Sequence, residues 1–121
     1  MTEKTILLVD DNEINIKLLE KVLENKYKII SVRDGETAVR KAKEIKPSLI
    51  IMDVAMPKMD GITATKLIKS SAETKNISII LITAHSLTID KEKIQDSGCN
   101  EFITRPIKMN ELIEAVEKNL K

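Results

Sequence analysis

The sequence predicts an α/β domain: a doubly wound, five-stranded parallel sheet in the flavodoxin-like strand order 2-1-3-4-5, with five helices. Short β-branched runs alternate with segments of helical periodicity from one end of the chain to the other. The strand runs are uniformly apolar, which is typical of parallel strands covered by helices on both faces. With 121 residues, of which 42% are hydrophobic, the chain has the length of one ordinary domain. We therefore expect residues 1–121 to form a single domain.

Each expected strand is a short run rich in isoleucine, leucine and valine. Because helical segments separate these runs, each crossover should be right-handed and should place its helix on a face of the sheet. The expected strands are Thr5–Val9, Lys28–Val32, Ser48–Met52, Ile77–Ile82 and Glu101–Thr104.

Helical spacing of apolar residues is clearest after the first strand and at the end of the chain. Weaker helical patterns cover residues 36–44, 62–70 and 89–97. The apolar positions of the two clearest helices are Ile14, Leu18, Leu19, Val22 and Leu23 in the first, and Met109, Leu112, Ile113, Val116 and Leu120 in the last.

Residues at the helix ends agree with this assignment. Pro47 follows the second helix and Gly98 follows the fourth, as expected where a helix stops. Lys108 stands where Asn or Ser would be expected, so the last helix has a poor cap. The side chains suited to capping the other helix starts are Asn12, Asp60, and Thr88 or Asp90.

The charge balance provides no overall field that would attract a polyanion. Twenty basic and nineteen acidic side chains leave a formal net charge of +1, so we expect neither nucleic acid nor a membrane as a partner. No apolar stretch approaches the roughly 20 residues needed to span a bilayer, and the N-terminal apolar run is too short for a signal peptide. The one cysteine, Cys99, cannot form an internal disulfide. These features favour a cytoplasmic protein.

Three carboxylates follow the two strands at the switch point of the predicted sheet. Asp10 and Asp11 come directly after the first strand, and Asp53 comes after the third. In this strand order the first and third strands are neighbours, and ligands bind beyond their carboxyl ends. We expect the three side chains to meet in one pocket.

Such a cluster needs a proton or a cation, because two carboxylates about 4 to 5 Å apart repel by roughly 3 to 4 kcal/mol at a dielectric constant near 20. Hard oxygen ligands, few in number and open to water, suit Mg²⁺, which often shares its shell with a phosphate. Taken alone, Asp10 and Asp11 are also anions that a helix N-terminus favours, and Asp53 could be a turn residue. A bare nucleotide phosphate is disfavoured, because the loop after the first strand is acidic and the chain lacks the glycine-rich phosphate-binding patterns.

Two more strand ends face the same crevice. The fourth strand is followed by Thr83, which offers a hydroxyl group, and the fifth is followed by Arg105, which offers a fixed positive charge. A nucleophilic carboxylate, a metal, a hydroxyl and a cation form the minimum set for moving a phosphoryl group.

With these residues in place, the whole chain resembles the response-regulator receiver family. Four segments carry the resemblance, and all four in order at these spacings are highly specific: LLVDDN at 7–12, IIMDVAMPKMDG at 50–61, ITA at 82–84 and TRPI at 104–107. Residues 98–107 are similar to receivers of hybrid kinases, phosphorelays and single-domain regulators.

The resemblance implies a phosphorylation switch that turns over no separate substrate. Asp53 would be the phosphoacceptor, and it would hold Mg²⁺ or Mn²⁺ together with Asp10, Asp11 and the backbone carbonyl of Ala55. A histidine kinase or a histidine phosphotransfer protein would supply the phosphoryl group.

The resemblance also implies how the signal would leave the site. Thr83 and Arg105 would be drawn to the phosphoryl oxygens, and Phe102, the aromatic switch, would turn inward behind Thr83. The surface around the fourth helix, the fifth strand and the fifth helix would then bind a downstream effector protein. A plain core position is an open alternative for Phe102, since apolar aromatic residues are mostly buried.

Arg105 departs from the family pattern, which has lysine before the proline. Lysine is a compact point charge, whereas the guanidinium is bulkier and favours bidentate pairing with a carboxylate. Arg105 could hold the phosphoryl oxygens, or form a surface ion pair, or clamp Asp53 in a phosphorylation-independent pseudo-receiver. A metal-dependent hydrolase is a further alternative, but five β/α units use the whole chain and leave no cap domain.

Two further expectations concern His85 and the chain ends. His85 lies two residues after Thr83 and is expected to affect the lifetime of the phosphorylated state rather than to carry phosphate. Met1 at the start, and an end directly after the last helix, favour a free-standing protein.

Overall fold

The computed structural model describes residues 4–84 and 88–120, without the side chains of residues 88–90. Five strands and five helices alternate along the chain. The strands are β1 (Thr5–Val9), β2 (Lys28–Val32), β3 (Leu49–Asp53), β4 (Ser78–Thr83) and β5 (Glu101–Thr104). The helices are α1 (Glu13–Leu23), α2 (Gly35–Ile45), α3 (Gly61–Ser70), α4 (Thr88–Asp96) and α5 (Met109–Asn119).

The five strands form one parallel sheet in the order β2-β1-β3-β4-β5. This order confirms the predicted flavodoxin-like, doubly wound α/β fold. β3 lies in the middle of the sheet with β1 on one side and β4 on the other, whereas β2 and β5 are its edges. The reversal of strand order between β1 and β3 creates the crevice in which such folds bind ligands.

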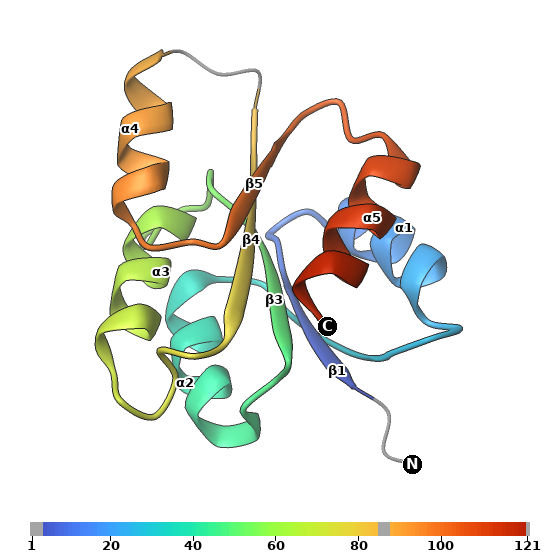
Figure 1. The fold of residues 1–121 in the computed structure, drawn as a ribbon, viewed down its shortest axis with the longest axis horizontal. Coiled ribbons are helices and arrows are strands. Elements are labelled where there is room, and N and C mark those ends of the chain that lie inside the picture. Colours follow the sequence, from blue (N-terminus) through green and yellow to red (C-terminus); the bar gives the residue numbers. More distant parts are fainter. Residues whose placement is uncertain (1–3, 85–87, 121) are drawn as a thin grey trace.

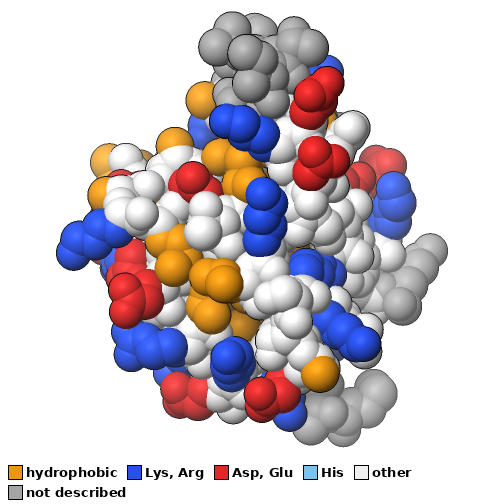
Figure 2. Space-filling model, turned by 90° about the vertical axis from the view of Figure 1, so that its left-hand side faces the viewer, with side chains coloured by type: hydrophobic (Ala, Val, Ile, Leu, Met, Phe, Trp, Pro, Cys, Tyr) orange, Lys and Arg blue, Asp and Glu red, His pale blue; other side chains and the backbone are white. Residues whose placement is uncertain are grey.

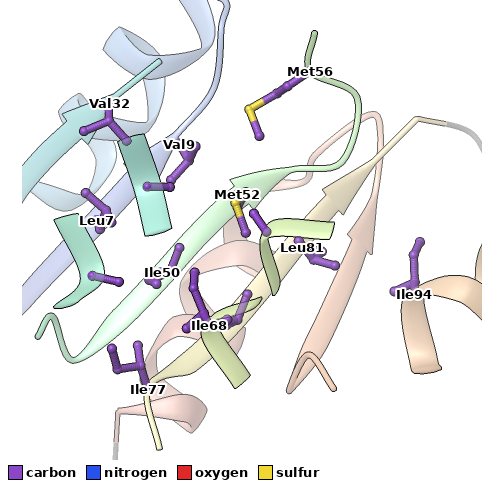
Figure 3. Packing of buried hydrophobic residues seen from close by; sticks show 14 residues of the cluster. Leu7, Val9, Val32, Ile50, Met52, Met56, Ile68, Ile77, Leu81 and Ile94 are labelled. Atoms are coloured by element: carbon purple, nitrogen blue, oxygen red, sulfur yellow. The ribbon is translucent and has the colours of Figure 1, made fainter. Parts of the chain in front are cut away.

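Helices cover both faces of the sheet, with α2, α3 and α4 on one side and α1 and α5 on the other (Figure 1). Each face has its own hydrophobic core, because side chains alternate between the two faces along every strand. All five residues of β3 are buried, which explains why the sequence of this strand is apolar up to its final acid. Figure 3 shows the core under α2 and α3, where Leu7, Ile50, Met52, Ile68 and Leu81 meet.

Strands β3 and β4 each begin and end one residue later than the sequence predicts, and the shift places two site residues inside the sheet. β3 extends to Asp53, which pairs with Ile82 of β4. β4 extends to Thr83, which pairs with Thr104 of β5. The backbone N–H of Val54 donates to Ile82 O at 2.8 Å, so the ladder continues past the acid. Asp53 and Thr83 are therefore held by the sheet itself.

The predicted helix caps agree with the structure where it describes them. The Asn12 side chain accepts hydrogen bonds from the first turn of α1, and the Asp60 side chain does the same for α3. Lys108 makes no side-chain capping bond, as expected. Asp34, which the sequence analysis did not single out, caps α2. The side chains of the candidate caps Thr88 and Asp90 lie outside the described part of the chain.

Charged and apolar side chains are mixed over the outer surface of α2, α3 and α4, where Figure 2 shows lysine and arginine beside acidic side chains and small apolar areas. Large exposed apolar side chains include Ile14 and Leu18 of α1, Leu67 of α3 and Ile113 of α5. Among the residues that the structure describes, no helix has both the length and the apolar character needed to cross a membrane.

Candidate functional site

The three acidic side chains meet at the carboxyl ends of β1 and β3, as the strand order predicts. Asp10 and Asp11 follow β1, and Asp53 is the last residue of β3. One carboxylate oxygen from each residue lies within 4.8 Å of the others. Asp11 is exposed, so the cluster opens to solvent on one side.

Asp10 is the most buried member of the cluster, with 3% of its surface exposed. Its Oδ1 accepts a hydrogen bond from the backbone N–H of Asn12 at 2.9 Å. Its Oδ2 accepts bonds from Asn15 Nδ2 at 3.2 Å and from Arg105 Nη2 at 3.4 Å. Both oxygens of this carboxylate are therefore held by protein donors.

Asp53 stands at the mouth of the crevice, 9% exposed. Its Oδ1 accepts a long hydrogen bond from the Ala55 N–H at 3.4 Å and lies 3.7 Å from Arg105 Nη2. Burial raises the pKa of the Asp53 carboxyl above its ordinary value, and the negative charge of Asp10 adds to the rise. Arg105 partly offsets this rise in the pKa.

The loop after β3 approaches Asp53 so closely that it requires a glycine. Gly61, the first residue of α3, donates its N–H to Val54 O at 2.8 Å. A Cβ atom on Gly61 would collide with the Asp53 carbonyl oxygen and would lie 3.0 Å from Val54 Cα. The start of α3 is thereby packed directly against the backbone that carries the acid. Ala55, whose carbonyl is a predicted metal ligand, is exposed in this loop.

Arg105 reaches the acids from the end of β5. Its backbone N–H donates to Thr83 O at 2.8 Å, which ties the ends of β4 and β5 together. Its guanidinium lies between Asp10 and Asp53 rather than on the outer surface. The structure thus brings Arg105 to the acidic cluster, and the surface ion pair that the sequence left open is not what these contacts show.

Thr83 and Phe102 lie on one face of the sheet. Thr83 pairs with Thr104, and Phe102 pairs with Leu81 two residues earlier in the ladder. Because residues two apart on a strand share a face, Phe102 lies diagonally next to Thr83. Thr83 is buried, whereas Phe102 is half-buried against the core under α4 and lines a hollow of about 340 Å³ beside α5. This position is neither a closed core site nor a free surface.

The donor set fits a hard divalent cation. Three carboxylates face a single guanidinium, so the cluster carries excess negative charge even with Arg105 in place. Oxygen ligands open to water on one side are typical of Mg²⁺ sites that leave room for a phosphate. The site can therefore neutralise and orient a phosphoryl group.

Two contributors to the site were not found by sequence reasoning. Asn15 contacts Asp10 from the first turn of α1, and Gly61 allows α3 to approach Asp53. The signal for Gly61 was its place at the start of a helix, directly after the loop that follows Asp53. No pattern in the sequence marked Asn15, because its contact depends on how α1 leaves the sheet. His85, for which an effect on the phosphorylated state was expected, lies outside the described residues.

Comparison with known proteins gives a consistent result. Residues 6–117 match the family model of the response regulator receiver domain. The polar-differentiation response regulator DivK of Brucella anthropi is 36% identical over 118 residues, which cover 97% of this chain and 96% of that protein.

Solved structures with the same fold include receiver domains attached to kinases. The signal receiver domain of a signal transduction histidine kinase from Syntrophus aciditrophicus has a TM-score of 0.91 and 35% identity, covering 97% of this chain and 89% of that one. The receiver domain of the sensor histidine kinase PA1611 from Pseudomonas aeruginosa has a TM-score of 0.90 and 32% identity, covering 98% of both chains. That structure has a magnesium ion coordinated in its active-site cleft.

Proposed function

This chain belongs to the response regulator receiver domain family, and we propose that it is a phosphorylation-activated switch in two-component or phosphorelay signalling that takes its phosphoryl group on Asp53. The observation that carries the proposal is the convergence of Asp10, Asp11 and Asp53 within 4.8 Å, with Arg105 facing Asp53. Receiver domains of this family are signalling modules, not enzymes that turn over a separate substrate. We propose one such domain over residues 1–121.

Asp53 is the proposed phosphoacceptor because it is the acid that the sheet holds most firmly at the open end of the crevice. In the transfer, an Asp53 oxygen forms a bond to phosphorus while the bond from phosphorus to the donor's imidazole nitrogen breaks. The reaction needs little covalent help from the protein, since it depends on positioning and on charge stabilisation. The buried backbone of β3 supplies the positioning.

We propose that Mg²⁺, or Mn²⁺ in its place, is held by Asp10, Asp11, Asp53 and the carbonyl of Ala55. Receiver domains generally bind Mg²⁺ at an acidic pocket, and the cluster in this chain has the oxygen donors that such an ion needs. When bound, the ion would neutralise the charge that gathers as phosphorus approaches Asp53. The Pseudomonas aeruginosa relative with magnesium in its cleft supports this assignment.

Thr83 and Arg105 are the proposed response elements. A phosphoryl group on Asp53 would add negative charge and acceptor oxygens beside a hydroxyl and a guanidinium. Movement of Thr83 toward it would open space next to Phe102, which is half-buried and shares the face of the sheet on which Thr83 lies. Phosphorylation would shift the population between two states of Phe102.

The phosphoryl donor is proposed to be a histidine kinase or a histidine phosphotransfer protein, partners with which receiver domains generally interact. The surface next to the acids offers apolar contacts for such a partner. Ile14 and Leu18 of α1 are 76% and 50% exposed. A hollow of about 470 Å³, lined by Leu18, Arg105 and Ile107 among others, continues this surface to the site. Exposed apolar residues beside a reactive group are typical of a protein docking face.

We place the output on the surface formed by α4, β5 and α5, where a downstream effector protein would bind. Phe102 connects this surface to Thr83, and the hollow beside α5 provides room for a side chain to move. A cytoplasmic location is part of the proposal and agrees with the free thiol of Cys99.

One observation favours a second candidate function. Arg105 already contacts both Asp10 and Asp53, so the chain could be a pseudo-receiver whose binding surface is set without phosphorylation. The guanidinium would then clamp Asp53 and mimic the switched state, and incubation with a phosphodonor would leave the protein unchanged.

Intact mass after incubation with a small phosphodonor, with and without Mg²⁺, distinguishes the two functions. We expect a gain of one phosphoryl group that requires both Mg²⁺ and Asp53 and is lost in Asp53→Asn. Asp96→Asn, which changes an exposed carboxylate at the end of α4, is the matched control and should be phosphorylated normally. A folded protein that binds Mg²⁺ but gains no mass would make the pseudo-receiver the better explanation.

A further inference from the structure

Asn15 lies in the first turn of α1, and its side-chain amide donates to Asp10 Oδ2 at 3.2 Å. We propose that Asn15 is a positioning residue, which holds the Asp10 carboxylate in the orientation that a divalent cation needs. The inference rests on the proposed function, because it assigns Asn15 a role at the same metal site.

The two oxygens of Asp10 are held in different ways. Oδ1 accepts from the backbone N–H of Asn12 at 2.9 Å, a contact that does not depend on the Asn12 side chain. Oδ2 depends on side chains, namely Asn15 and Arg105. Since only 3% of Asp10 is exposed, solvent has little access to replace a lost donor. On the Oδ2 side, the position of this carboxylate therefore depends on Asn15 and Arg105.

The contact between Arg105 and Asp10 is expected to weaken when Asp53 is phosphorylated. Its Nη2 is shared between Asp10 Oδ2 at 3.4 Å and Asp53 Oδ1 at 3.7 Å. When a phosphoryl group is added to Asp53, the guanidinium is drawn toward the new negative charge and away from Asp10. Asn15 contacts Asp10 and not Asp53 among the described hydrogen bonds, so it can hold the carboxylate in both states.

An amide suits this task because it orients without adding charge. A second cation at this position would compete with the metal for the carboxylates, whereas a neutral donor leaves the negative charge of the cluster intact. Hydrogen bonds from outer groups to ligating carboxylates fix their geometry, and removing such a partner typically weakens metal affinity about 10-fold to 100-fold.

The helix cap explains why Asn15 reaches Asp10. The Asn12 side chain accepts from the backbone N–H groups of Ile14 and Asn15, at 2.9 and 3.2 Å. This cap fixes the first turn of α1 directly after Asp10, and the Asn15 side chain extends back from that turn to the strand end. The loop and the helix start thus form one unit with the carboxylate.

The test measures Mg²⁺ and Mn²⁺ affinity by calorimetry in the unphosphorylated protein. Asn15→Leu removes the donor at nearly constant volume, and Asn15→Ala removes it without added bulk. We expect both variants to bind the ions about 10-fold to 100-fold more weakly than the unsubstituted protein. Asn110→Leu, in the first turn of α5, is the matched control and should bind normally.

Thermal unfolding of the metal-free proteins separates positioning from a general structural role. We expect Asn15→Ala to unfold at nearly the same temperature as the unsubstituted protein while binding metal more weakly. Unchanged metal affinity in both folded Asn15 variants would overturn the inference alone. If the unsubstituted protein binds neither ion, the metal site of the proposed function fails, and the inference fails with it.

Discussion

The guanidinium of Arg105 lies 3.7 Å from the carboxylate of Asp53, which places a fixed positive charge beside the proposed phosphoacceptor. The contact joins the edge strand β5 to the central strand β3. Both candidate functions use this contact, and shortening the side chain tests the first of them, because loss of a cation that assists transfer should slow phosphorylation.

Arg105→Ala should lower the rate of Asp53 phosphorylation by a small phosphodonor about 100-fold, since it removes a charge that stabilises the transferring group. Arg105→Lys should recover most of the rate, because the ammonium supplies the same charge. The rate is followed by intact mass over time. Arg40→Ala, on the exposed side of α2, serves as the control. A rate in Arg105→Ala equal to that of the control would show that Arg105 does not assist the transfer.

Asp53→Asn should stabilise the metal-free protein at pH 7, by an amount on the order of 1 kcal/mol, because it removes a buried charge next to Asp10 that Arg105 only partly compensates. The folded-state pKa of Asp53 is raised, so its contribution to stability is fully present below the unfolded pKa of about 3.9 and is lost as the pH rises through the folded pKa. The gain should therefore disappear near pH 3.

Urea unfolding in the presence of EDTA, at a series of pH values, measures this effect. Asp96→Asn is the control, since that carboxylate is exposed and should show no comparable gain. A gain for Asp53→Asn that is the same at pH 3 and pH 7 would contradict the assignment of the effect to the Asp53 charge.

Gly61→Ala should destabilise the protein by about 2 kcal/mol or more, because the added Cβ collides with the Asp53 backbone and neither element can move freely. The same collision should displace the acid and slow its phosphorylation. Urea unfolding gives the stability. Thr63→Ala, an exposed position on the same helix, should cost much less. Equal costs for the two variants would mean that the loop after β3 adapts to the added atom.

Lys69→Met should destabilise the protein by about 1 to 3 kcal/mol, because it removes the donor for three oxygen atoms. The Lys69 ammonium donates to Ile77 O at 2.7 Å, to Asn100 Oδ1 at 2.9 Å and to Lys75 O at 3.3 Å. These bonds tie α3 to the start of β4 and to the loop before β5. Lys66→Met, exposed on α3, is the control in urea unfolding. A cost no larger than that of the control would mean that water satisfies the three oxygens.

Strand order and layer arrangement could be predicted because they depend on patterns that repeat along the chain. Uniformly apolar runs such as residues 49–52 indicated helices on both faces, and the alternation of strands and helices left few possible orders. The same reasoning placed Asp10, Asp11 and Asp53 at one edge of the sheet. It set both boundaries of β3 and of β4 one residue early. The carboxyl ends were missed because polar residues at a strand end can still pair with a neighbour.

The contacts within the site could not be predicted, because they depend on how far a side chain reaches. The sequence left three roles open for Arg105, and its position between Asp10 and Asp53 favours the two roles that act at the acidic cluster over a surface ion pair. The contact of Asn15 with Asp10 likewise requires the direction in which α1 leaves the strand. The residue type of Phe102 was compatible with two roles, a core residue and a switch. Its half-buried position depends on the helix packed beside it.

The place of β3 in the middle of the sheet has a consequence for hydrogen–deuterium exchange. A strand paired on both sides opens only when the whole domain unfolds, whereas an edge strand can detach at lower free energy. The amides of β3 up to Asp53 should thus exchange slowest, and those of β5, which precede Arg105, should exchange sooner. The proposed phosphoacceptor is thus anchored in the part of the sheet that should exchange slowest, whereas Phe102 in β5 and Arg105 directly after it belong to an edge that can open at lower free energy.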